Sequence, residues 1–79
     1  MNNIEKKCQI RNVRLTDQRK IIAKVMSNSS DHPDVDELHK RVNKLDKKIS
    51  IATVYRTVKL FEESGIVEKH DFKGGKARY

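Results

Sequence analysis

The chain has 79 residues, and its 18 Lys and Arg against 11 Asp and Glu give a formal net charge of +7 and a pI near 9.8. A chain of this length forms one small domain that buries only about 60% of the surface of its unfolded form, which argues against a large enclosed active site. The basic balance is typical of proteins that meet nucleic acid or an anionic membrane, and a merely basic soluble domain is the alternative.

The sequence predicts neither a membrane anchor nor a disulfide. No apolar run approaches the ~20 residues that cross a bilayer, and no secretory signal follows the N-terminus, so we expect a cytoplasmic protein. Its single cysteine, Cys8, has no CxxC partner and is expected to be a free structural thiol.

Residues 1–14 are polar and basic with scattered apolar side chains, and they favour either a short helix or a tethered arm. Arg11 and Arg14 come just before the first strong helix start. An arm that reaches along DNA and a solvated basic tail both remain open.

Two helices are expected next. Thr16 is a typical N-cap, and the apolar residues around it predict a helix of about three turns that ends in the loop 27–33. Asp34 with Glu37 resembles a capping box and starts a second helix. Its apolar stripe at 3, 4, 3 spacing consists of Val35, Leu38, Val42 and Leu45.

The stretch from Ser50 to Ser64 predicts the helix that matters most, with Ser50 as its N-cap and Gly65 as the left-handed residue that ends it. The predicted buried stripe is Ile51, Val54, Val58 and Phe61. The opposite face and its flanks carry Ala52, Thr53, Tyr55, Arg56, Lys59 and Glu63. Hydroxyls, a phenol and a guanidinium beside a small residue suit a DNA groove, and an ordinary amphipathic surface helix is the alternative.

Residues 66–79 predict a β-hairpin closed by a two-residue Gly74-Gly75 turn. In that register Lys73 faces Lys76 and Asp71 faces Arg78. Opposed lysines repel each other unless a phosphate lies between them, so the turn suggests a basic wing; two solvated lysines are the alternative. The chain stops at Tyr79 inside an expected strand, and we therefore expect it to be the front part of a longer protein.

The expected helices, followed by a small antiparallel β-hairpin, make a mainly α fold and predict a winged helix-turn-helix over residues 15–79. The segments that carry a more specific signal are Thr16–Arg19, Asp31-His32, Ile49–Val58 (ISIATVYRTV) and His70–Lys76. Together they resemble the N-terminal DNA-binding domain of the ferric uptake regulator family, from about Val13 to Tyr79. Members of that family are metal-dependent repressors whose second domain, absent from this chain, dimerises and holds most of the metal ligands.

The resemblance implies that Tyr55 and Arg56 read bases in the major groove, where Arg can bond G bidentately and a phenol can pack on a thymine methyl. Arg14 takes the place of a basic residue that enters an A·T-rich minor groove. The expected phosphate contacts are Ser50, Thr53, Lys59, Lys73, Lys76 and Arg19, with a structural pair to Asp17 as the alternative for Arg19.

The resemblance also implies that His32 is a metal ligand completed by side chains beyond residue 79. The chain itself is expected to hold no cofactor, whereas the full-length protein is expected to bind iron, zinc or manganese and to form a homodimer. The isolated chain is then monomeric or weakly associated, and its expected partner is an A·T-rich palindromic operator.

Two other function classes compete with this interpretation. A winged-helix module that docks an acidic protein through its basic face fits the same helix. An enzyme is not expected, because the sequence shows no nucleophile motif, no carboxylate pair at a fixed spacing and no Gly-rich loop before a helix.

Overall fold

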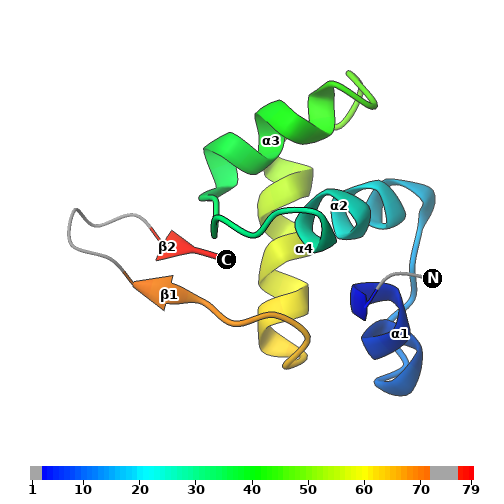
Figure 1. The fold of residues 1–79 in the computed structure, drawn as a ribbon. Helices are drawn as coiled ribbons and strands as arrows, with labels where there is room; N and C mark the ends of the chain where they lie inside the picture. Colours follow the sequence, from blue (N-terminus) through cyan, green and yellow to red (C-terminus); the bar gives the residue numbers. More distant parts are fainter. Residues whose placement is uncertain (1–2, 72–76) are drawn as a thin grey trace.

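The computed structural model of the chain describes residues 3–71 and 77–79. Over these residues the elements follow in the order α1 (Asn3–Ile10), α2 (Asp17–Ser27), α3 (Val35–Asn43), α4 (Ile51–Glu63), β1 (His70–Asp71) and β2 (Ala77–Arg78) (Figure 1). The fold is thus mainly helical, as predicted. No helix within the described ranges has the length and apolar character needed to cross a membrane.

Helix α1 occupies most of the segment for which an arm and a short helix were both open. Ile4 and Cys8 lie one turn apart and are both buried in the core, so one side of α1 is anchored to the domain. Cys8 is a free thiol with no exposed surface, as expected for a structural cysteine. Burial, followed by the charge of Glu5, raises the pKa of this thiol.

The predicted caps of α2 and α3 are present. Thr16 Oγ1 accepts a hydrogen bond from the Arg19 amide at 3.3 Å, and Asp34 Oδ1 accepts one from the Glu37 amide at 2.9 Å. The Glu37 carboxylate lies 3.3 Å from Arg41 Nε. The prediction for Leu45 was wrong: α3 ends at Asn43, so Leu45 leaves the helical stripe and is 57% exposed.

Both predicted ends of α4 are confirmed. Ser50 Oγ accepts from the Thr53 amide at 3.2 Å, and Gly65 has φ +72°. The Gly65 amide donates to Glu62 O and the Ile66 amide donates to Phe61 O, which is the paired arrangement that closes a helix with a left-handed residue.

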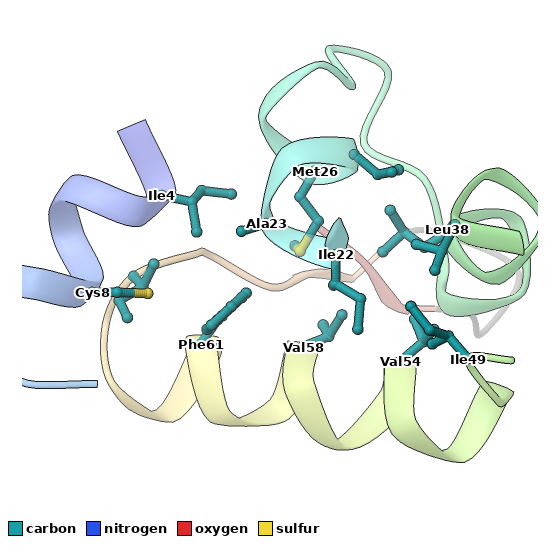
Figure 2. Packing of buried hydrophobic residues seen from close by; sticks show 13 residues of the cluster. Ile4, Cys8, Ile22, Ala23, Met26, Leu38, Ile49, Val54, Val58 and Phe61 are labelled. Carbon is teal, nitrogen blue, oxygen red and sulfur yellow. The ribbon is translucent and has the colours of Figure 1, made fainter. Parts of the chain in front are cut away.

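The core runs along one side of α4. Figure 2 shows Val54, Val58 and Phe61 pointing from α4 toward Ile22, with Cys8 near the Phe61 end and Ile49 near the Val54 end. Burying each such side chain contributes roughly 1.5–3 kcal/mol. These contacts fix which side of α4 faces outward.

The predicted buried stripe of α4 included one residue that is exposed, Ile51, and left out one that is buried, Thr57. Ile51 is 44% exposed, because it lies in the first turn at the edge of the buried stripe. Thr57 is only 3% exposed and takes a place between Val54 and Phe61 on the buried side. The buried stripe is therefore rotated toward Thr57.

The two strands pair antiparallel, with His70 opposite Arg78 and Asp71 opposite Ala77. The predicted pair of Asp71 with Arg78 was therefore wrong by one residue. In a hairpin with a two-residue turn, an even number of residues lies between any two residues that face each other across the strands. Five residues lie between the observed partners Asp71 and Ala77, so their pairing does not fit that register. The predicted Gly74-Gly75 turn itself lies outside the described residues. Beyond β2, the Tyr79 amide donates to Pro33 O at 3.1 Å, which joins the chain end to the loop before α3.

Candidate nucleic-acid interface

The connection between α3 and α4, residues 44–50, is held by two side chains of α3. Asn43 Nδ2 donates to Ile49 O at 2.8 Å, and His39 Nε2 donates to the same carbonyl at 3.2 Å. Because a carbonyl only accepts, this contact requires the His39 proton on Nε2. The two bonds immobilise the residue before the N-cap, so the start of α4 is positioned by α3.

The outward side of α4 carries the two predicted base readers. Tyr55 is 50% exposed, and Arg56, the next residue, is exposed as well. Within the described part of the chain, neither side chain has a hydrogen-bond or ion-pair partner. An exposed guanidinium without an acidic neighbour keeps its donors available to an external ligand.

Ser50 and Thr53 combine a structural role with a spare donor. Their hydroxyl oxygens lie 3.1 Å apart, and Ser50 Oγ also accepts from the Thr53 amide. The two hydroxyls carry two hydrogens, and the bond between them uses one, whichever group donates. One hydroxyl hydrogen therefore remains available at the N-terminus of α4.

A polar depression of about 240 Å³ lies between α2 and α4. Arg19 and Arg56 lie at its walls, and its other lining residues are Thr16, Gln18, Thr53 and Thr57. Arg19 does not pair with Asp17, as one interpretation of the sequence held. Its Nη1 instead donates to the backbone oxygen of Arg14 at 2.9 Å.

The remaining predicted phosphate contacts are spread along the chain. Lys59 is half-buried on α4, and Arg14 is exposed in the link between α1 and α2. Lys73 and Lys76 lie outside the described residues. The described part of the predicted surface thus consists of the α4 face, the start of α2 and the link before it.

His32 lies apart from this surface, in the loop before α3. Its φ is +50°. Its Nδ1 lies 3.3 Å from Tyr79 O, and because a carbonyl oxygen only accepts, this hydrogen bond requires a proton on Nδ1. No cluster of three or more potential metal ligands occurs among residues 3–71 and 77–79. The described residues therefore do not make a metal site by themselves.

The His32 loop is fixed by an ion pair. Arg41 donates to both carboxylate oxygens of Asp31, at 2.9 and 2.7 Å, and to Ser29 Oγ at 3.0 Å. The hydrogen bond from Arg41 is the main cause that lowers the pKa of Asp31 to about 2, and the same contact raises the pKa of Arg41.

Residues 10–79 match the sequence pattern of the ferric uptake regulator family, which covers most of the chain. The chain belongs to this family.

The comparisons place it at the family's N-terminal domain. A ferric uptake regulation protein from Rhizobium leguminosarum bv. viciae is 55% identical over 76 residues, which are 96% of this chain and 54% of that protein. Two solved structures, a manganese uptake regulator and a zinc-bound manganese uptake regulator, are both 52% identical, with TM-scores of 0.90 and 0.93. They are matched over 100% and 99% of this chain and over 58% and 59% of their own. The chain thus spans little more than half the length of these relatives.

Three residues that shape the surface of this ferric uptake regulator domain, Gln18, His39 and Asn43, were not among the predicted site residues. Gln18 lines the depression with Arg56, and a signal existed for it, because a cap at Thr16 places Gln18 in the first turn of α2. No local pattern in the sequence predicts the hydrogen bonds that Asn43 and His39 make to Ile49 O. Their contacts with Ile49 depend on the path of the connection between the two helices, which periodicity does not specify.

Proposed function

We propose that this chain is the DNA-binding domain of a metal-responsive transcriptional repressor, with α4 in the major groove. The observation that carries the proposal is the state of Tyr55 and Arg56. They lie next to each other, exposed and without partners among the described residues, on a helix whose other side is core. A helix held in this way presents these side chains to a groove from a backbone that has little freedom left to lose on binding.

The proposed division of roles follows the chemistry of each group. Arg56 bonds a guanine edge, Tyr55 packs on a thymine methyl, and Arg14 enters an adjacent A·T-rich minor groove. The phosphate contacts come from the spare hydroxyl of Ser50 and Thr53, from Arg19 and Lys59, and from Lys73 and Lys76 on a wing over residues 66–79. Only the first set specifies sequence.

The intact protein is proposed to work in the cytoplasm as a homodimer that binds a palindromic operator and responds to a divalent metal. Family membership supports this, together with relatives named for the uptake of iron and of manganese, one of them bound to zinc. Within the described residues His32 is the one candidate ligand carried over from the family, and the other ligands are proposed to come from the part of these relatives that this chain does not span. Two copies held together would raise the apparent affinity well above that of one.

Two variants of α4 test the assignment of base readers. Arg56→Ala should lower the preference for operator over scrambled duplex, because a bidentate base contact discriminates by about 1–3 kcal/mol. Lys59→Ala should weaken binding to both duplexes alike and reduce the salt slope by about 1. Equal effects of the two variants on preference would remove the base-reading role of Arg56. A domain that docks an acidic protein would not distinguish the duplexes at all.

A further inference from the structure

The link between α1 and α2 is anchored on both sides of Arg14. The Val13 amide donates to Cys8 O at 2.8 Å, and the Val13 side chain packs against the core. On the other side, Thr16 caps α2 and Thr16 O accepts from the Lys20 amide at 2.9 Å. Figure 1 shows the link running from α1 to α2. Arg14 is exposed in this link and is therefore presented from a short segment with two fixed ends.

Arg19 adds a third anchor at Arg14 itself. Arg19 is in the first turn of α2, where its amide bonds the Thr16 cap, and its half-buried side chain folds back so that Nη1 donates to Arg14 O at 2.9 Å. A guanidinium has five donors in a rigid fork, so it holds this carbonyl with one of them and keeps others for the depression that it shares with Arg56.

The geometry assigns Arg19 the role of a positioning residue for Arg14, an assignment that rests on the proposed DNA-binding function. By fixing the backbone oxygen of Arg14, Arg19 holds the arm residue at a set place relative to α4, on which Arg56 lies. Sequence preference in the minor groove then depends on Arg19 even where Arg19 touches no base. A residue that only bonds phosphate would instead affect all sequences alike.

Arg19→Lys separates these two roles, because lysine keeps the charge but is shorter and lacks the fork. Affinity is measured by fluorescence anisotropy for two duplexes that differ only by A·T or G·C pairs at the minor-groove position. We expect the A·T preference to fall by about fivefold or more, to the level of Arg14→Ala, with the salt slope unchanged. In the Arg14→Ala background, Arg19→Lys should then have no further effect on that preference. Lys20→Arg, on the exposed neighbour, is the matched control and should leave it intact.

A second measurement needs no DNA. Backbone NMR order parameters of the Arg14 and Leu15 amides should fall in Arg19→Lys and not in Lys20→Arg, while the core amides and the thermal midpoint stay near those of the parent. Unchanged order at Arg14 would overturn the proposal, as would an A·T preference that survives Arg19→Lys. A parent chain without any preference between the duplexes would instead remove the proposed function on which the assignment rests.

Discussion

The carboxylate of Asp31 and the guanidinium of Arg41 form two parallel hydrogen bonds, Nη1 to Oδ1 at 2.9 Å and Nη2 to Oδ2 at 2.7 Å. The pair ties the loop that carries His32 to the last turn of α3. Because α3 also holds the start of α4 through Asn43, the loop and the helix proposed to read DNA are supported by the same element. Arg41 is thus a structural cation.

The acid stability of the domain should depend on this pair. Arg41 lowers the pKa of Asp31 from 3.8 to about 2. A depressed carboxyl pKa adds stability that is complete above the ordinary value and is lost as the pH falls through the folded value. Asp31→Asn should therefore lower the thermal midpoint at about pH 7 and make little difference at about pH 2. High salt should reduce the effect, because both groups are partly exposed.

A double-mutant cycle isolates the contact. In an Arg41→Ala background, Asp31→Asn should leave the thermal midpoint almost unchanged at either pH. If Asp31→Asn still lowered the thermal midpoint at low pH or in the Arg41→Ala background, the ion pair with Arg41 would not be the cause.

Two isoleucines that flank the N-cap of α4 give a matched test of the core boundary. Ile49 is 1% exposed and Ile51 is 44% exposed. Ile49→Ala should cost about 2–5 kcal/mol in the free energy of unfolding, and Ile51→Ala well under half as much. Urea unfolding of both variants measures this. Similar costs would show that Ile51 belongs to the core, as the simple 3, 4, 3 stripe predicts.

The conformation of Gly65 should make it sensitive to substitution. Its φ of +72° disfavours a side chain, so Gly65→Ala should cost about 1–2 kcal/mol in the free energy of unfolding. A Cβ there would lie 3.3 Å from Arg11 Nη1, the movable end of a side chain, so Arg11→Ala should not rescue the variant. Gly65→Asn is the control and should cost less, because asparagine tolerates this region. Equal costs for Ala and Asn, or rescue by Arg11→Ala, would point to crowding.

Ser50 should separate stability from DNA affinity. Ser50→Ala removes the acceptor for the Thr53 amide and should cost about 1 kcal/mol in the free energy of unfolding. Ser50→Asp keeps the cap and should retain stability, but it places a negative charge at the proposed phosphate contact. DNA affinity should then fall while the thermal midpoint holds. Binding by Ser50→Asp as tight as that of the parent would exclude Ser50 from the phosphate contacts.

The helices and caps of this fold could be predicted because their signals are local. Thr16, Asp34 and Ser50 each accept a bond from the amide three residues on, and Gly65 takes the left-handed conformation that its position requires. The prediction was wrong at Leu45 and Ile51, where burial depends on where a helix ends and what packs over its first turn. The strand register was wrong because it depends on tertiary pairing, which the Gly-Gly signal did not determine.

The candidate site divides in the same way. The exposure of Tyr55 and Arg56 follows from helical periodicity once the apolar stripe is known. The bond from Arg19 to Arg14 O and the support of Ile49 by Asn43 and His39 do not, because they join a side chain to a backbone atom on another segment.

The central claim, base readout by this domain, is tested most directly by fluorescence anisotropy. The chain is titrated onto an A·T-rich palindromic duplex and a scrambled duplex of the same composition, each at two salt concentrations. Affinity for both should fall steeply with salt, because the release of counterions from the contacted phosphates becomes less favourable, and the palindrome should be preferred at each concentration. Equal affinity for the two duplexes at both concentrations would contradict base readout and leave only phosphate contacts.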